Sequence, residues 1–307
     1  MFEAFSIGPF LIWTYAVFLL LAVWTSSEFF FRLARSARLS IEPFKQHAWL
    51  FFLAFVLGGR LTAILMDYRV YLRDLPRMFI IWDGGFSFLG AAIGIGVVLF
   101  WTTKDQRSTF LQWLDVLLPA TSFGLFFDWL GKFAAGHAYG RPTDHFWGVT
   151  YEAMNVRYVV PIEPVQLYYA FFFLLLTFIL LIVRKHASRA GAETLVGIVL
   201  ATIATFLFEY SRGDFAIPVF ASQADFVVLF LLFLSLGIFA IIERHLSGQA
   251  MYIYEVILVV LLLAYVVLRE RLSLPTHELR FSQFLAVLAL LATVVYVVVH
   301  RRKYPHL

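Results

Sequence analysis

Residues 165–183 read VQLYYAFFFLLLTFILLIV, an apolar run that contains no charged side chain. A helix of about 20 mostly apolar residues crosses the hydrocarbon core of a bilayer, so this run predicts a membrane-spanning helix. Similar runs predict eight more spans, at 7–27, 47–67, 84–102, 109–128, 193–210, 224–243, 250–268 and 281–300. No alternation typical of a β-barrel is visible. We therefore expect an all-α polytopic membrane protein.

The composition of the whole chain agrees with this expectation. Of 307 residues, 62% are hydrophobic and only 14% are charged, whereas about a quarter of the residues in soluble domains are charged. Disordered, collagen-like, coiled-coil and soluble α/β proteins are thereby excluded. The absence of cysteine excludes disulfides, Cys-ligated metals and a cysteine nucleophile. The net charge of +4 does not predict nucleic-acid binding, because no basic stripe is interleaved with aromatic residues.

The loops between the predicted spans indicate the organisation of the chain. Lys and Arg are commoner in cytoplasmic loops, and their distribution favours an N-terminus outside the cytoplasm. The segment ERHLSGQ at 243–249 separates seven spans from two more. We predict a membrane core at 1–243, with a long extracytoplasmic loop at 129–164. We also predict an additional segment at 244–307 with two further helices and a basic tail.

The long loop is the first place where function is expected, because long ordered loops in compact proteins are usually functional. It brings Lys132, His137 and Arg141 within ten residues, just beyond a span. Cations at that depth suit a phospholipid phosphate, and His is the usual general base near neutral pH. Interfacial snorkelling of Lys and Arg explains the cluster equally well.

Glycines mark a second candidate region, where WDGGFSFLGAAIGIG spans residues 82–96. Gly84, Gly85 and Ser87 open a helix, where free backbone N–H groups commonly bind anions. Simple helix packing explains these three residues equally well, and it is the favoured interpretation of the later glycines, Gly90, Gly94 and Gly96.

Polar residues within other spans are further candidates. An arginine inside a span, such as Arg60, costs about 2.5–3.5 kcal/mol and needs a partner or an anion. A structural ion pair is therefore an alternative to a site. Glu209 and Arg212 lie on one helix face at i, i+3 spacing. Asp115 is more typical of helix packing, and on the residues alone Tyr15 is more typical of a core. No metal or cofactor motif is found, and we expect neither group.

Taken in order, these segments resemble bacterial prolipoprotein diacylglyceryl transferase over roughly residues 7–243. The resemblance implies a seven-helix membrane fold that moves a diacylglyceryl group from phosphatidylglycerol to the cysteine thiol of a lipoprotein precursor. It rests on IGPFLIWTYA at 7–16, GGRL at 58–61, WDGGFSF at 82–88, Asp115 with Pro119, GHAYGRPTDHFWGV at 136–149, EPVQLYY at 163–169 and FEYSR at 208–212.

The residues and the resemblance together predict a site. Tyr15, His137 and Glu163 are the expected catalytic residues. The expected substrate-binding residues are Arg60, Gly84, Gly85, Ser87, Lys132, Tyr139, Gly140, Arg141, Gln166, Glu209 and Arg212.

Several positions depart from the family pattern. Leu89 stands where the family has a histidine, and Trp129 and Thr205 stand where it has arginines. The family's glutamate and histidine are exchanged here, as His137 and Glu163. A hydrogen bond between these two side chains would fix the imidazole tautomer and raise its basicity.

Two functions from different classes remain open at this point. In the first, the protein is a diverged transferase of the bacterial cytoplasmic membrane. Arg60, Lys132 and Arg141 hold the headgroup of phosphatidylglycerol, and His137, oriented by Glu163, deprotonates the acceptor thiol. In the second, the protein is an inactive family member that binds lipid or serves as a subunit of a membrane complex. The replaced residues favour the second function, because loss of a positioned base costs about 10²–10⁴-fold in rate.

Overall fold

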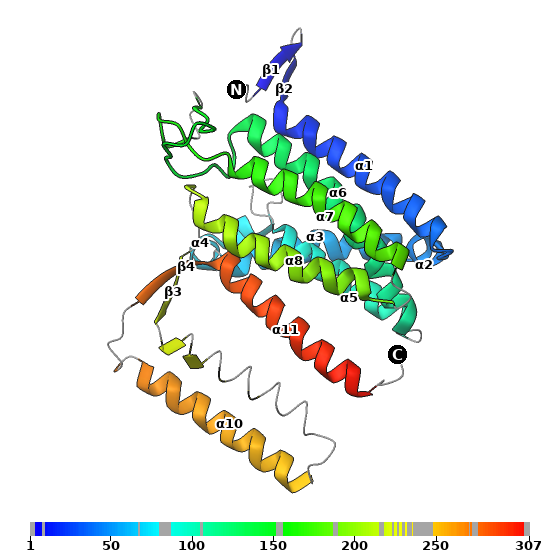
Figure 1. Ribbon diagram of the computed structural model, residues 1–307, viewed down its shortest axis with the longest axis vertical. Helices are drawn as coiled ribbons and strands as arrows, with labels where there is room; N and C mark the ends of the chain where they lie inside the picture. Colours follow the sequence, from blue (N-terminus) through cyan, green and yellow to red (C-terminus); the bar gives the residue numbers. More distant parts are fainter. Residues whose placement is uncertain are drawn as a thin grey trace. The chain divides into compact units, whose positions relative to one another are not determined.

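A computed structural model gives the fold, and it describes residues 4–7, 10–66, 68–79, 87–104, 107–151, 156–186, 190–214, 218–222, 224–225, 227–228, 231, 235, 248–269, 271 and 276–303. Most of the described residues are helical, and a few short strands accompany the helices (Figure 1). In chain order the elements are β1 (Ala4–Ile7), β2 (Phe10–Trp13), α1 (Thr14–Ser36), α2 (Glu42–Gln46), α3 (Ala48–Met66), α4 (Tyr68–Arg73), η1 (Leu75–Phe79), α5 (Phe88–Thr102), α6 (Arg107–Ala135), α7 (Val165–His186), α8 (Ala192–Phe208), η2 (Glu209–Ser211), β3 (Pro218–Ser222), α10 (Gly248–Arg269), β4 (Thr276–Arg280) and α11 (Phe281–Lys303).

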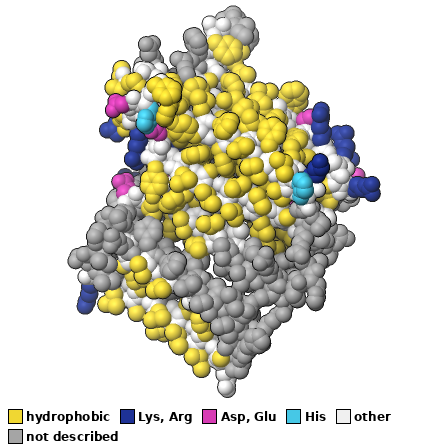
Figure 2. Space-filling view, viewed as in Figure 1, with side chains coloured by type: hydrophobic (Ala, Val, Ile, Leu, Met, Phe, Trp, Pro, Cys, Tyr) yellow, Lys and Arg dark blue, Asp and Glu magenta, His cyan; other side chains and the backbone are white. Residues whose placement is uncertain are grey.

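The expectation of an all-α polytopic membrane protein is confirmed. Five stretches are long and apolar enough to cross a bilayer: Thr14–Ser36, Ala48–Leu65, Phe110–Ala135, Val165–His186 and Ala192–Ser211. Helices α5, α10 and α11 contain shorter apolar stretches. In Figure 2, hydrophobic side chains cover much of the upper part of the face shown, and the charged and His side chains lie mainly at its margins. Such a surface needs an apolar solvent, so the chain is a multi-pass membrane protein.

Two predicted boundaries differ from the observed ones, and a third falls mostly outside the described residues. The first span was expected at 7–27, but β1 pairs with β2 from Ala4↔Trp13 to Ile7↔Phe10, and α1 begins only at Thr14. Pro9 disfavours a helix through that segment, because proline lacks a backbone N–H and its ring crowds the preceding turn, although α6 accommodates Pro119. Helix α6 continues seven residues beyond the predicted end at 128, so part of the expected loop is helical. The predicted span at 224–243 lies mostly outside the described residues, and the boundary near 243 stays a prediction.

The described chain forms two compact units. One contains residues 1–25, 122–189 and 195–307, and the other contains 26–121 and 190–194. We call them the loop unit and the glycine unit, respectively. Residues that the sequence analysis placed in one site are thus divided between the two units.

Glycines bring α3 and α5 together inside the glycine unit. A Cβ on Gly58 or Gly90 would collide with the backbone of the facing helix, and a Cβ on Gly94 would collide with the carbonyl of Ala54. The packing interpretation of Gly90 and Gly94 is thereby confirmed. It is wrong for Gly96, which faces open space.

A buried carboxylate in this unit binds the backbone at the start of α8 (Ala192–Phe208). Asp115 of α6 accepts hydrogen bonds from the Gly191 and Thr194 backbone N–H groups, at 2.6 and 2.9 Å, and from the Thr194 hydroxyl at 2.7 Å. The free N–H groups at the start of α8 are thus satisfied. The prediction that Asp115 serves packing and not a site agrees with this geometry.

In the loop unit, aromatic packing joins α6, α7 and α8. Trp129, Val165, Tyr169 and Ala170 form one buried cluster, against which Phe208 packs. Figure 1 shows α6 and α7 side by side, and the loop that connects them lies at the same end as β1 and β2. Helix α6 stops at Gly136, whose φ of +73° suits a glycine at a helix C-terminus.

Candidate functional site

The first part of the site is a polar chain between α1 and α6. The Tyr15 hydroxyl donates to Asp128 Oδ1 at 2.9 Å, and Asp128 Oδ2 lies 2.6 Å from Lys132 Nζ. Asp128 and Lys132 are four residues apart on α6, so the helix itself aligns them. The Lys132 charge is also 4.3 Å from the centre of the Trp129 ring, a cation–π contact. Lys132 is therefore held by an anion and an aromatic ring.

Aromatic side chains connect the polar residues of α6 to those at the end of α8. Trp129 stacks on Tyr169 with ring centres 4.1 Å apart and planes inclined by 9°. The Tyr169 hydroxyl donates to Glu209 Oε1 at 3.1 Å. Trp129, at a position where the resemblance implied an arginine, thus contributes packing and a ring face instead of a charge.

Two acids and two arginines meet where α8 ends, and we call Glu209, Arg212, Asp214 and Arg280 the arginine–acid cluster. Arg212 reaches Glu209 Oε1 at 2.6 Å and both Asp214 oxygens at 3.0 and 2.6 Å. The Arg280 Nη1 atom lies 3.3 Å from Asp214 Oδ1 and 3.8 Å from Glu209 Oε2. Burial by itself lowers the pKa of Arg212, but its hydrogen bonds to Asp214 and the charges of Glu209 and Asp214 raise it above the usual range.

Backbone contacts attach the long loop to this cluster. The Arg141 backbone N–H donates to Ser211 O, and the Gly213 N–H donates to Tyr139 O, both at 2.9 Å. A Cβ on Gly140 would collide with the Glu163 carbonyl, and a Cβ on Gly213 would collide with the Gly140 carbonyl. Glycine is therefore required at both positions, because backbone segments cross there at close range.

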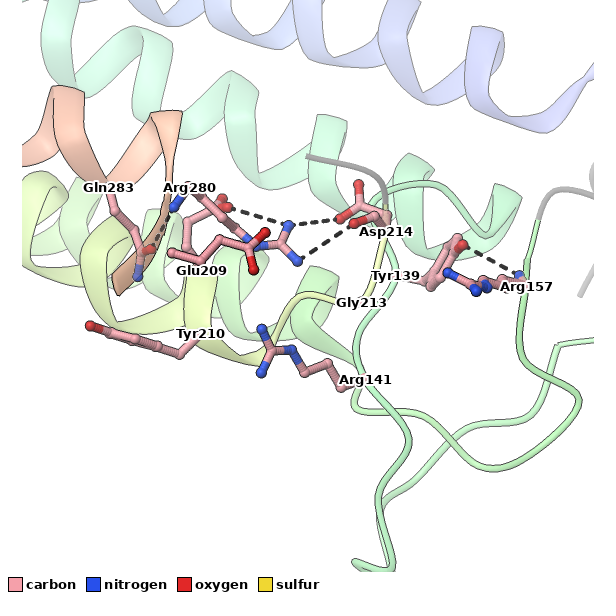
Figure 3. Close-up of a pocket in the computed structure, with 10 residues that line it drawn as sticks. Tyr139, Arg141, Arg157, Glu209, Tyr210, Gly213, Asp214, Arg280 and Gln283 are labelled. Atoms are coloured by element: carbon pink, nitrogen blue, oxygen red, sulfur yellow. Dashed lines mark hydrogen bonds and ion pairs between the residues drawn. The ribbon is translucent and has the colours of Figure 1, made fainter. Parts of the chain in front are cut away.

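A cavity of about 580 Å³ opens beside the cluster (Figure 3). Its charged lining residues are Arg141, Arg157, Glu209, Asp214, Glu278 and Arg280. The Arg141 side chain is exposed and donates through Nε to Arg212 O at 3.1 Å. The Arg157 backbone N–H donates to the Tyr139 hydroxyl at 3.3 Å, and its guanidinium has no partner within the described part of the chain. Two arginines thus line the cavity with N–H donors, an arrangement suited to an anion.

The expected pair of His137 and Glu163 does not form in the described structure. His137 is exposed, and among the described residues no hydrogen bond or ion pair joins its ring to the Glu163 carboxylate. The His137 ring instead contacts Tyr15 edge-on, with ring centres 5.3 Å apart. The fully buried Gln166 side chain donates to His137 O at 2.8 Å and so fixes the backbone that carries this histidine.

Arg60 and Ser87 belong to the glycine unit. Arg60 is buried, and its guanidinium donates to Arg77 O at 2.6 Å and to Met78 O at 3.2 Å. It also lies 5.1 Å from the centre of the Tyr71 ring. Ser87 caps α5 by accepting from the Gly90 N–H at 3.4 Å. Two other predicted anion-binding residues, Gly84 and Gly85, lie outside the described residues.

Five acidic or basic residues were missed by sequence reasoning: Asp128, Arg157, Asp214, Glu278 and Arg280. Asp128 had a signal, because it precedes Lys132 by one helical turn. Asp214 follows Arg212 by two residues and could have been grouped with it. Arg280 had no signal, since 66 residues separate it from Asp214. In the described part of the chain, no group of three His, Asp or Glu side chains is placed to hold a metal ion.

Comparison with known proteins gives one family. The family model described as prolipoprotein diacylglyceryl transferase matches residues 3–241. A phosphatidylglycerol–prolipoprotein diacylglyceryl transferase of Pseudoalteromonas atlantica is 29% identical over 238 residues, which is 76% of this chain and 80% of that protein. A protein of the same name from Polynucleobacter necessarius is 38% identical over 117 residues, which is 38% of this chain. Another, from Photobacterium profundum, is 32% identical over 164 residues, which is 52% of this chain. The matched segments span 44% and 60% of those two relatives, less than two thirds of their lengths.

Proposed function

Because this chain belongs to the prolipoprotein diacylglyceryl transferase family, we propose that it binds phosphatidylglycerol in the bacterial cytoplasmic membrane and transfers the diacylglyceryl group to a lipoprotein cysteine. The names of its relatives state this donor and this acceptor for those proteins. The distribution of Lys and Arg supports an extracytoplasmic N-terminus, which places the long loop on the same side as an exported precursor.

One observation carries the proposal: the cavity beside the arginine–acid cluster is lined by Arg141 and Arg157, whose guanidinium groups face open space. A guanidinium offers paired N–H donors that match phosphate oxygens. Arg141 also sits at the end of the apolar helices, where a phospholipid headgroup would lie. The two acids of the cluster are already paired with Arg212 and Arg280, so they do not cancel the charge of Arg141.

The proposal assigns the following chemistry to this region, with Arg141 of the cavity wall and with His137, which precedes it in the same loop. His137 takes the proton from the acceptor thiol, and the thiolate attacks the glycerol carbon of the diacylglyceryl group. The bond between that carbon and the phosphate oxygen breaks, and glycerol phosphate leaves as an anion whose charge Arg141 stabilises. The nucleophile belongs to the acceptor, so the absence of cysteine in this chain is consistent with the mechanism.

The groups that orient the proposed base, His137, differ from those expected from the sequence. Since Glu163 forms no hydrogen bond with His137 in the described structure, the proposal assigns the orientation of the imidazole to its edge contact with Tyr15 and to the backbone anchor from Gln166. Glu163 then acts through its backbone, whose N–H donates to Arg141 O at 2.9 Å.

A second function is favoured by Trp129. Its stacked, buried ring occupies a position where the family has a charged side chain, and Thr205 and Leu89 are also uncharged. A family member with these replacements that binds phosphatidylglycerol without transferring it would be a lipid-binding subunit of a membrane complex.

Reconstitution separates the two functions. The full chain is placed in vesicles of phosphatidylglycerol and phosphatidylcholine with a lipobox peptide, and the diacylglyceryl adduct is measured by mass spectrometry. We expect an adduct, reduced by about 10²–10⁴-fold in His137→Ala. The matched control is His145→Ala, since His145 lies exposed in the same loop and stacks on Trp147. Lipid binding without any adduct would favour the subunit, and an undiminished adduct in His137→Ala would remove the assigned base.

A further inference from the structure

The C-terminal segment 276–283, which contains β4 and the start of α11, lies beyond the residues that match the family. It is nevertheless packed into the loop unit. The Gln283 side chain is 2% exposed, accepts from the Arg280 N–H at 3.0 Å and donates to Phe206 O in α8 at 3.0 Å. Leu279 and Ala286 on either side are also buried. The segment is thus anchored by a buried amide and by apolar contacts.

Because Gln283 fixes this segment, Arg280 lies in the wall of the cavity. Figure 3 shows its guanidinium directed between Glu209 and Asp214. Besides these ion pairs, Arg280 Nη2 donates to Arg212 O at 2.5 Å. The same carbonyl oxygen accepts from Arg141 Nε at 3.1 Å. The Arg212 carbonyl therefore couples the position of Arg280 to that of Arg141, the residue that faces the cavity.

The charges give Arg280 a second effect. Glu209 and Asp214 are balanced by Arg212 and Arg280, and among the described lining residues this leaves Arg141 and Arg157 in excess over Glu278. If Arg280 were neutral, the two acids would share the single charge of Arg212, and the positive excess around the cavity would disappear. An anion in the cavity would then be bound less tightly, because charges act over several ångströms in a partly buried site.

We propose that residues 276–283 form part of the substrate site and that Arg280 is a positioning residue. It holds Arg141 through the Arg212 carbonyl and neutralises the acids of the cluster, so that the cavity accepts the phosphodiester headgroup of an anionic phospholipid. The inference rests on the proposed function for the identity of the ligand. It assigns a role in the site to a segment outside the family match.

The test uses the full chain in detergent and measures phosphatidylglycerol binding by native mass spectrometry, with transfer kinetics as a separate measurement. We expect Arg280→Gln to weaken binding about tenfold and to raise KM more than it lowers kcat. Arg280→Lys should recover part of the affinity, since it restores the charge but not the planar fork. The matched control Arg271→Gln, at an exposed position outside the site, should bind like the unaltered chain.

Charge compensation distinguishes this role from a structural one. Adding Asp214→Asn to Arg280→Gln restores the charge balance and should recover most of the affinity, whereas a structural contact would be damaged further. Glu278→Gln keeps every ion pair of the cluster and removes an acid from the cavity wall, so it should tighten binding two- to threefold, roughly the effect of one distant charge. This variant keeps the test informative if Arg280→Gln does not fold.

The outcomes separate this inference from the proposed function. Binding by the unaltered chain that falls in Arg280→Gln, with no adduct in either protein, would support the role of Arg280 and contradict transfer. Equal binding and transfer in Arg280→Gln and the unaltered chain would overturn the role of Arg280 and leave the proposed function standing. Weakened binding in both Arg280→Gln and the double variant would assign Arg280 to structure alone and also overturn the inference.

Discussion

Two regions of this protein hold carboxylates that are buried or half-buried, and the hydrogen bonds and ion pairs that fix them differ. In the glycine unit, Asp115 accepts three hydrogen bonds from neutral groups of Gly191 and Thr194. In the loop unit, Glu209 and Asp214 are paired with the charged Arg212 and with a second arginine from β4. The first carboxylate caps a helix, whereas the other two line an open cavity.

The difference shows how a carboxylate that stabilises the fold can be distinguished from one that takes part in a ligand site of a membrane protein. A carboxylate that accepts hydrogen bonds from backbone N–H groups at the start of a helix stabilises that local geometry. A carboxylate paired with arginines beside a cavity sets the charge that an incoming ligand meets. The comparison predicts that substitutions in the first region change stability alone, and that those in the second change ligand binding as well.

The largest effect is expected for Arg212→Ala. Its removal leaves Glu209, which is only 3% exposed, without its 2.6 Å partner, and breaking a buried ion pair costs about 3–5 kcal/mol. We expect a loss of that size in the free energy of unfolding, measured in detergent, together with loss of phosphatidylglycerol binding. The control is Arg32→Ala, whose pair with Glu28 is exposed and is worth about 0.5 kcal/mol. Equal effects in both variants would remove the distinction between buried and exposed pairs.

Asp115→Ala tests the other side of the comparison. The N–H groups of Gly191 and Thr194 lose their acceptor, and an unsatisfied buried donor costs about 1–3 kcal/mol. We expect thermal unfolding in detergent at a lower temperature, with unchanged lipid binding and transfer per folded molecule. A variant of full stability that no longer binds lipid would place Asp115 in a site and break the comparison.

Tyr15→Phe should have a smaller effect on stability and a selective effect on activity. The hydrogen bond to Asp128 is lost, which costs about 0.5–1.5 kcal/mol. Because Asp128 also holds Lys132, and Tyr15 contacts the His137 ring, we expect transfer to fall by about tenfold. Tyr252→Phe, at an exposed position of α10, serves as the control for loss of a phenol. Parallel losses in the two variants would argue against a role for Tyr15 in the site.

The smallest effect, and one of opposite sign, is expected for Gly96→Ala in the glycine unit. Nothing lies near its Cβ position, so the variant should gain about 0.5–1 kcal/mol from the better helix propensity of alanine. Gly94→Ala, two residues away, should destabilise the unit because its Cβ would meet the Ala54 backbone. Unfolding in detergent compares the two variants directly. Loss of stability in Gly96→Ala would show a close contact at that position.

The helices and one part of the site could be predicted because their signals are local. The apolar run at 165–183 matches α7 closely, since length and hydropathy suffice to define a span. Glu209 and Arg212 were expected on one face, and an ion pair of 2.6 Å joins them. The start of the first helix was predicted too early, because an apolar run at the end of a chain can also form a hairpin.

Other features depended on contacts between distant segments. The hydrogen bond expected between His137 and Glu163 required two loop residues to meet, and their backbones are instead fixed by other partners, Gln166 and Arg141. Likewise, the participation of Arg280 follows from the docking of Gln283 on α8, a contact between residues 77 positions apart.

The sequence by itself determined the membrane environment, the positions of most spans and the family, because each of these depends on composition or on short ordered motifs. The tertiary structure decided which charges face each other. A guanidinium can satisfy any carboxylate that it reaches, so neither the identity of Arg280 nor that of Asp214 indicates their pairing. Only the packing of β4 and α11 beside the end of α8 brings Arg280 to Glu209 and Asp214, and that packing gives the cavity its charge.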